Sequence, residues 1–263
     1  MTHGTCATTP RLWILPLLLL ITGCMISCES TNQMLKARAV AFSPFIEHPG
    51  EMQPARNRIP VHYIWRSPDE ALRRRAMPKT EIYIAPVQLQ YLRPLKRPLV
   101  RFEVKHGSID RNEAKMAAAL HDDFANAFFK SPAPRYRLTP KANDRSVTLE
   151  LAIIELNPTS PKGNAVKTAA KFVVGPLSML GGYFTKGNMA VEGKVRNSAT
   201  GELLFQFADN EADRMTFFSL RDFRPYGHAG QASEDWASQF ELFTRTPPQH
   251  KIVDTFFFTL DPR

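Results

Sequence analysis

Two alternating segments on either side of residues 197–201 constrain the fold of this 263-residue chain more than any other pattern. Apolar residues recur at alternate positions between Met189 and Val195, and again between Leu203 and Phe207. A period of two places successive side chains on opposite faces of a strand, so that one face is buried and the other is wet. The residues between the segments, Asn-Ser-Ala-Thr-Gly, are mostly turn formers. The pattern therefore predicts a β-hairpin.

Further strands are predicted before this hairpin. Residues 80–85 and 146–156 are rich in β-branched and other apolar residues, which favours strands. In the second segment, the apolar residues first occupy odd positions, up to Ile153, whereas Ile154 and Leu156 occupy even positions and would lie on the other face of a regular strand. This change indicates a bulge or burial on both faces. Residues 99–105 alternate Val, Phe and Val with charged side chains, which predicts a strand with one buried face. Shorter strands are expected at 135–138 and at the edge of the sheet in the tail, 251–260.

Two long helices are also predicted. The first begins at Asp110, which Glu113 follows in a capping-box arrangement, and the prolines from Pro132 onward stop it. The second begins near Ser233 and ends before Pro247. Both have apolar residues three and four positions apart, the spacing of a helix that lies on a sheet. We therefore expect an α+β domain with two main helices on one face of a mostly antiparallel sheet of about five strands.

Residues 42–79 are expected to form an irregular, proline- and arginine-rich arm that precedes this domain. Five prolines between residues 44 and 68 preclude long regular elements. Apolar residues such as Trp65 indicate that the arm packs on the domain and is not a free linker. Residues 70–77 are predicted to form one or two helical turns, with the three arginines 73–75 in solvent.

The N-terminus indicates export and lipidation. Residues 12–21 form an apolar run preceded by Arg11, as in a secretory signal, and the run has about half of the roughly 20 residues of a membrane-spanning helix. The following Leu-Ile-Thr-Gly-Cys resembles the lipobox of bacterial lipoproteins. The resemblance implies cleavage between Gly23 and Cys24 and a lipid on the Cys24 sulfur. Met25 after that cysteine favours the outer membrane, by the same resemblance. An uncleaved anchor or a buried N-terminal helix is the alternative.

The net charge and the cysteine content limit the kinds of partner and site that the mature chain can have. Removing residues 1–23, which contain one Arg and no acid, lowers the net charge of +9 to +8. This charge fits contact with anionic lipids or polymers of the envelope, or ordinary surface charge. Export argues against a nucleic-acid partner. The folded part has no Cys, so it can hold no disulfide and no thiolate metal site.

The expected divisions are a signal peptide at 1–23, the lipidated Cys and tether at 24–41, the arm at 42–79, the α+β domain at 80–246 and the tail at 247–263.

A search for catalytic motifs gives no strong candidate. The sequence has no G-x-S-x-G elbow, no H-E-x-x-H pair and no phosphate-binding loop. His121, followed by two Asp residues, is the most suggestive group, against the alternative of a polar helix face. We expect no catalytic set, no cofactor and no metal. An envelope hydrolase or glycan-modifying enzyme that uses His121 or His228 with carboxylates stays open as an alternative.

An uncharged run of 13 residues, 172–184, needs a separate explanation. A Gly-Pro pair interrupts the run, and it is too short for a helical span. It forms either part of the core or a lid, or else a contact with a partner or with the bilayer next to the lipid, as in a membrane-inserting assembly. The residues that would make this contact are Phe172, Val173, Leu177, Met179, Leu180, Tyr183 and Phe184.

Several short motifs, together with the lipobox, carry a family resemblance. They are residues 59–65, Ile-Pro-Val-His-Tyr-Ile-Trp; strand 82–87; the turn 199–202; and Asp-Trp-Ala at 235–237. These motifs resemble uncharacterised bacterial lipoproteins classed as a domain of unknown function. More loosely, the order of elements is similar to the α/β domains of the curli-secretion lipoprotein and of the TolB N-terminus. The resemblance implies an interaction or assembly role in the envelope, with a lipid anchor in the outer membrane and the domain in the periplasm.

Overall fold

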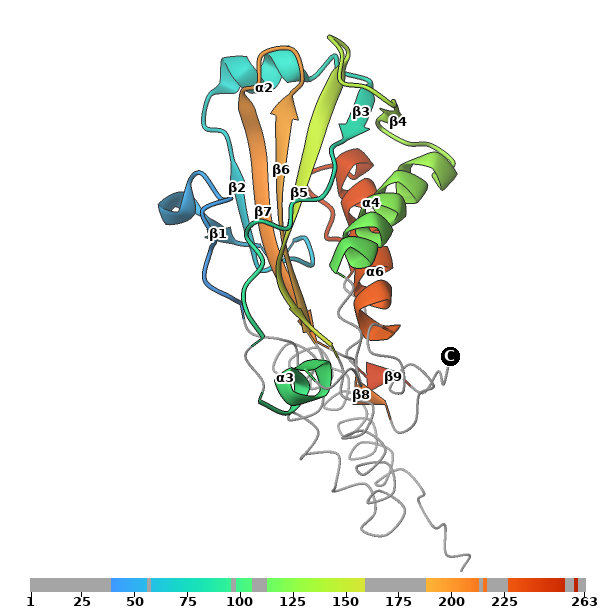
Figure 1. Cartoon of the computed structure of the whole chain (residues 1–263). Coiled ribbons are helices and arrows are strands. Elements are labelled where there is room, and N and C mark those ends of the chain that lie inside the picture. Colours follow the sequence, from blue (N-terminus) through green and yellow to red (C-terminus); the bar gives the residue numbers. More distant parts are fainter. Residues whose placement is uncertain are drawn as a thin grey trace, which may run out of the picture. The chain divides into compact units, whose positions relative to one another are not determined.

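The main feature of the computed structural model is a seven-stranded sheet in the order β1-β2-β7-β6-β5-β3-β4 (Figure 1). Together with its helices, this sheet gives the α+β class that the sequence predicts. The structure describes residues 39–55, 58–95, 98–105, 113–158, 188–212, 215–216, 227–253 and 258–259.

Three long antiparallel strands form the centre of the sheet: β5 (Ser146–Asn157), β6 (Asn188–Asn197) and β7 (Leu203–Ala212). The predicted hairpin is confirmed as β6 and β7. Gly201 closes the turn with a φ of 72°, a conformation that a residue without a Cβ adopts at little cost. The predicted irregularity in β5 is also confirmed, because the pairing with β6 shifts between Ile153 and Glu155.

The prediction of about five strands is wrong, because the proline-rich arm contributes one edge of the sheet. Its residues Tyr63–Arg66 form β2, which pairs antiparallel with β7, and Gln53–Pro54 form β1 beside β2. At the opposite edge, β3 (Glu81–Ile84) lies parallel to β5, and β4 (Arg137–Leu138) lies parallel to β3. The sheet is therefore mixed. The arm also contains a 3-10 helix, η1 (Pro49–Glu51), and α2 (Glu70–Ala76), where the Asp69 carboxylate caps the first turn.

The strand predicted at 99–105 is also wrong, since these residues lie in α3 (Pro98–Lys105). Pro98 at the first helical position has a φ already suited to a helix. Alternation over only six residues does not separate the two periods, because Leu99 and Phe102 are also spaced as on one helical face. Phe102 is 59% exposed, so the alternation does not mark a buried strand face.

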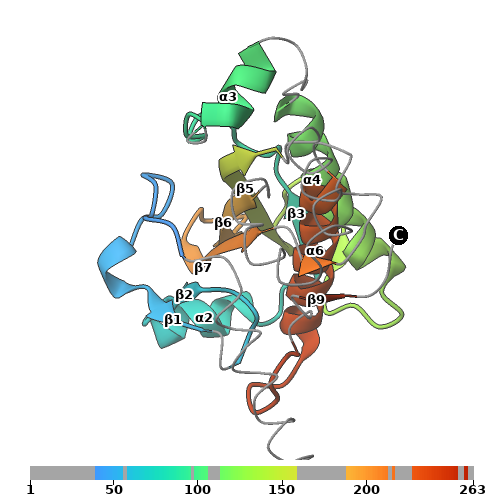
Figure 2. The same ribbon diagram turned by 90° about the horizontal axis from the view of Figure 1, so that it is seen from below.

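The two long helices are α4 (Glu113–Lys130) and α6 (Gly227–Arg245). Figures 1 and 2 show them side by side against the sheet. Leu120, Phe124 and Phe240 are buried between the helices and the central strands. The predicted start at Asp110 lies outside the described residues. The other helix, α6, begins six residues before the predicted start at Ser233. The prediction missed these first turns because they are rich in Gly and Ala and lack the apolar spacing on which it depended.

The other sheet face is covered by the beginning of the arm. Phe45 and Ile46 pack on Ala152, Ile154 and Ala190 in a second apolar cluster. Nearby, a carboxylate on β6 is also buried. Glu192 is 1% exposed, and it accepts hydrogen bonds from the Ser43 backbone N at 2.8 Å and the Ser43 Oγ at 2.5 Å. Burial raises the pKa of Glu192, and these hydrogen bonds partly oppose that shift.

The described part of the tail does not join the seven-stranded sheet. Phe258–Thr259 (β9) pairs with Met215–Thr216 (β8) in a separate two-stranded parallel sheet. A strand therefore does form within 251–260, but it pairs with β8 and not with the edge of the seven-stranded sheet. Earlier in the tail, the Ile252 N donates a hydrogen bond of 2.8 Å to the Arg58 carbonyl.

Several predicted features lie outside the described residues. They include the cleavage and lipidation site at Gly23 and Cys24, and all seven residues named in the run 172–184. Among the helices that the structure does describe, none has both the length and the apolar character needed to cross a membrane.

Candidate functional site

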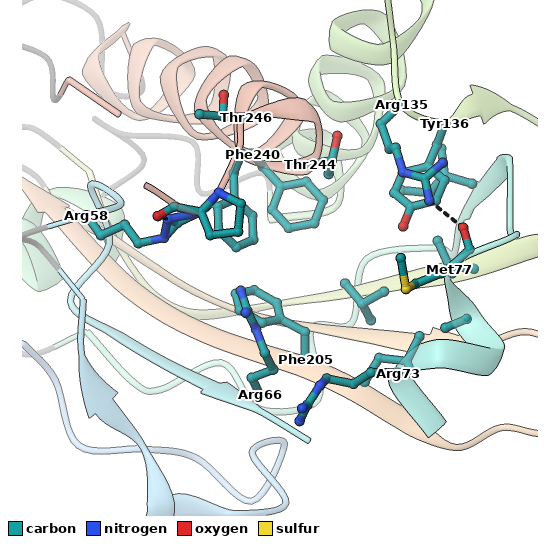
Figure 3. A pocket seen from close by; sticks show the side chains of 17 residues that line it. Arg58, Arg66, Arg73, Met77, Arg135, Tyr136, Phe205, Phe240, Thr244 and Thr246 are labelled. Atoms are coloured by element: carbon teal, nitrogen blue, oxygen red, sulfur yellow. Dashed lines mark hydrogen bonds between the residues drawn. The ribbon is translucent and has the colours of Figure 1, made fainter. Parts of the chain in front are cut away.

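A pocket of about 340 Å³ lies where the C-terminal end of α6 meets α2, β2 and the segment before β4 (Figure 3). Four arginines from separate parts of the chain surround it: Arg58 before β2, Arg66 on β2, Arg73 on α2 and Arg135 before β4. We call this feature the arginine pocket. No carboxylate side chain from the described residues lines it.

The floor of the arginine pocket is apolar. Phe205 on β7 and Phe240 and Phe243 on α6 form an aromatic group, with ring centroids 5.3 Å apart for Phe205 and Phe243. Ile82 and Val147 from the sheet complete the floor. Figure 3 shows Phe205 and Phe240 between Arg58 on one side and Arg135 on the other. The site therefore combines a ring of cations with an apolar base.

Three of the arginines are positioned by backbone carbonyls. Arg58 donates to the carbonyl of Pro248, and its guanidinium carbon lies 5.7 Å from the Phe243 ring centroid. Arg73 donates to the Ser67 carbonyl, and Arg135 donates to the Met77 carbonyl at 2.5 Å. A guanidinium has five N–H donors, so each of these bonds fixes the side chain without neutralising its charge.

Arg66 is the fourth cation, and its guanidinium group makes no hydrogen bond or ion pair with the described part of the chain. Partial burial lowers the pKa of Arg66, and the positive charges of Arg58 and Arg73 lower it further. An arginine still stays charged at physiological pH. The mutual repulsion of these guanidinium groups would be relieved by a bound anion.

Tyr136 adds a further polar group to the wall. Burial raises its pKa, with Arg135 partly opposing the shift, so the phenol stays protonated at neutral pH. The Arg135 guanidinium carbon lies 5.1 Å from the Tyr136 ring centroid. The hydroxyls of Thr244 and Thr246 donate to carbonyls of α6. The guanidinium groups are therefore the main hydrogen-bond donors that a ligand would meet.

A second hollow, of about 540 Å³, lies along α4 and α6 and has a different character. It is lined by charges of both signs, and several of these groups bind one another. Glu241 accepts hydrogen bonds from Ser131 at 2.7 Å and from Arg245 at 3.0 Å, while Asp123 accepts one from Ser233 at 2.5 Å. Burial raises the pKa of Asp123. These contacts join the two helices and already use the polar groups of the second hollow. The arginine pocket is therefore the better candidate for a ligand site.

The residues singled out for catalysis do not come together. The His121 Nδ1 does lie 3.1 Å from an Asp122 carboxylate oxygen, although neighbours on a helix point about 100° apart. Both side chains are partly or largely exposed, and neither lines either hollow. His228 belongs to the first turn of α6. In the described ranges, no three His, Cys, Asp or Glu residues are grouped as a metal site requires.

No sequence pattern indicates the arginine pocket. The three arginines 73–75 are predicted to lie together in solvent, but Arg73 lines the pocket and the other two do not. Arg74 pairs with Glu70 at 2.6 Å, and Arg75 pairs with Glu202 at 3.3 Å. The basic composition of the arm was the only signal, and it did not indicate which guanidinium groups converge.

Comparisons with known proteins give one family, and solved structures that are similar only at low identity and low TM-score. A family model described as "Protein of unknown function (DUF3313)" matches residues 43–240. No match was found among curated proteins. The PelC dodecamer from Paraburkholderia phytofirmans (space group P6) is similar at 9% identity and a TM-score of 0.35, over 67% of this chain and 96% of that one. The hypothetical protein CT253 from Chlamydia trachomatis is similar at 10% identity and a TM-score of 0.32, over 64% and 98%.

The family match spans the arm, the seven-stranded sheet and most of α6, so it covers the greater part of the chain. It confirms the resemblance to proteins classed as a domain of unknown function. The chain belongs to the DUF3313 family of proteins of unknown function.

Proposed function

We propose that this chain is a lipoprotein of the bacterial cell envelope that acts by binding and not by catalysis, and that it holds an anionic partner in the arginine pocket. The lipid on Cys24 would anchor it in the outer membrane, with the α+β domain in the periplasm. The single observation that carries the binding role is the convergence of four guanidinium groups on one apolar pocket without a lining carboxylate.

The composition of the pocket favours an anion for a physical reason. Surface arginines are commonly paired with acids, as Arg74 and Arg75 are. The four pocket arginines are instead held by carbonyls or lack a described partner, so their charges add. A planar guanidinium can donate two parallel hydrogen bonds to a carboxylate or a phosphate. An anion would therefore be bound more strongly here than at a surface where the charges are already paired.

The anchor is supported by the lipobox-like segment at 20–24. Several acyl chains hold a protein stably on a bilayer, whereas one chain binds only marginally. We expect Cys24→Ala to abolish incorporation of radiolabelled palmitate in a Gram-negative host and to release the protein from the membrane fraction. Cys28→Ala is the matched control and should keep both label and location. Palmitate labelling that persists in Cys24→Ala would contradict this anchor.

The pocket can be tested in cells by photo-crosslinking from its rim. Met77 lines the pocket and is 67% exposed, so p-benzoylphenylalanine in its place would sit beside a bound partner. We expect an adduct at this position that is at least tenfold weaker when Arg66→Gln and Arg73→Gln are combined. Hydrogen bonds to charged groups contribute about 1.5–3 kcal/mol each, and about 1.4 kcal/mol is a factor of ten.

Two controls make this crosslinking experiment specific. Arg74→Gln with Arg75→Gln removes the same charge from neighbouring residues that do not line the pocket, and it should leave the adduct unchanged. The same probe at Phe129, which is 78% exposed on α4 and does not line the pocket, should not give that adduct. No adduct at the rim, or one equally strong in both double variants, would refute binding through the arginine pocket.

A further inference from the structure

The size and the floor of the arginine pocket restrict the ligand beyond its charge. Small-molecule sites usually have volumes of about 300–1,000 Å³, and this pocket, at about 340 Å³, lies near the lower end. That space suits one short chain and is small for a lipid with two chains.

The floor is suited to hydrocarbon and not to a second polar group. Phe205, Phe240 and Phe243 line the pocket together with Ile82 and Val147, and the hydroxyls of Thr244 and Thr246 donate to α6 carbonyls. A polar ligand group placed on this floor would lose its hydrogen bonds to water without replacement. A chain of methylene groups would lose none, and its transfer from water to such a surface is favourable.

The four arginines of the pocket determine the charge of the other end of the ligand, its head group. Arg66 and Arg73 come from β2 and α2, while Arg58 and Arg135 lie before β2 and before β4, so the guanidinium groups approach the pocket mouth from several directions. They match an anionic head that accepts several hydrogen bonds, which a carboxylate and a phosphate both do. Neither a neutral alcohol nor a cation provides that charge.

We propose that the ligand of the arginine pocket is a single-chain amphipathic anion, with its acyl or alkyl chain on the aromatic floor and its carboxylate or phosphate head among the four guanidinium groups. This inference rests on the proposed function and names the chemical class of the anionic partner. The head can come from a fatty acid or from a single-chain phosphate ester, and the experiment separates the two.

The experiment uses the full, lipidated chain in nanodiscs and a decanoic acid that carries a diazirine and an alkyne. Irradiation should label peptides that line the pocket, from β7 or from α6. Arg66→Gln with Arg73→Gln should lower this labelling at least tenfold, while Arg74→Gln with Arg75→Gln should leave it unchanged. Circular dichroism of each variant verifies that the fold is intact.

Competition then identifies the head and the chain. Decanoate and decyl phosphate should each reduce the labelling, and their relative strengths distinguish carboxylate from phosphate. Decanol and decyltrimethylammonium should not compete. In the series hexanoate, octanoate and decanoate, affinity should rise about fourfold for each added methylene group, since one buried CH₂ contributes about 0.8 kcal/mol.

Each opposite result overturns the inference. Equal competition by decanol would show that the head is not selected by charge, and butyrate as strong as decanoate would show that the floor takes no chain. Labelling confined to peptides away from the pocket, or unaffected by the loss of Arg66 and Arg73, would show that this ligand does not bind in the arginine pocket. If these results appear while the Met77 adduct still depends on the arginines, the pocket binds another anion and the proposed function stands. If that dependence is also absent, both fail.

Discussion

Asp209→Ala is expected to lower the free energy of unfolding by about 3 kcal/mol or more, because one buried carboxylate joins two strands and a helix. Asp209 is 3% exposed. Its Oδ1 accepts a hydrogen bond from the His62 backbone N at 2.9 Å and lies 2.5 Å from the His62 Nδ1. Its Oδ2 accepts a hydrogen bond of 2.7 Å from the Trp236 Nε1.

The size of this effect follows from the donors that the substitution leaves behind. A buried donor without a partner costs about 1–3 kcal/mol, and alanine strands at least the indole N–H and the His62 backbone N–H. These groups lie on α6 and beside β2, so the loss also weakens the attachment of the helix and of the sheet edge to β7.

Urea denaturation followed by circular dichroism measures the change. The matched control is Asp144→Ala, which removes an exposed carboxylate in the turn before β5 and should cost within about 0.5 kcal/mol. A loss below about 1 kcal/mol for Asp209→Ala would mean that the carboxylate does not join these three elements.

Gly193→Ala is expected to destabilise the domain by about 3 kcal/mol, at the upper end of the usual cost of overpacking. A Cβ at Gly193 would lie 2.1 Å from the Phe207 Cε1, far inside van der Waals contact. Phe207 is the cross-strand partner of Gly193 in the β6–β7 hairpin and is itself buried. Neither the ring nor the strand can move away without disturbing the core under α6.

Thermal and urea unfolding of Gly193→Ala should be compared with Gly230→Ala. A Cβ at Gly230 would meet nothing within 4 Å, and alanine favours a helix interior by about 1 kcal/mol over glycine. The two variants make the same chemical change, and we expect opposite signs. Adding Phe207→Leu to Gly193→Ala should recover part of the loss, because the smaller side chain leaves room for the methyl group. A Gly193→Ala protein as stable as the wild type would disprove the close packing of this ring.

The parts of the fold that depend on local periodicity could be predicted from the sequence. The β5 irregularity and the existence of α4 and α6 follow from the spacing of apolar residues over ten or more positions, and the β6–β7 hairpin follows from two shorter alternating segments with turn formers between them. The segment at 99–105 could not be assigned in this way, because six residues fit both periods and Pro98 favours a helix. Propensity also gave no signal for the start of α6 at Gly227.

The arginine pocket could not be predicted, for a different reason. Arg58, Arg66, Arg73 and Arg135 are spread over nearly 80 residues, and they converge only because β2 joins the sheet beside β7 and β4 joins it beside β3. Strand order is a property of long-range pairing, which local patterns do not determine. The prolines of the arm further concealed β2, which is a strand of only four residues between β1 and β7.

The pairing of β2 with β7 has a consequence for the order in which the chain folds. His62 and Asp209, which meet at this edge, are 147 residues apart in sequence, so β2 leaves the ribosome long before its partner exists. Contacts between distant residues form slowly, because a long loop must close before any stabilisation is gained. Until β7 is present, β2 can pair only with the short β1, and a chain that ended before residue 203 would leave the other side of β2 without a partner. We therefore expect the pairing of β2 with β7 to form late in folding, so that the first described strands of the chain are among the last to join the sheet.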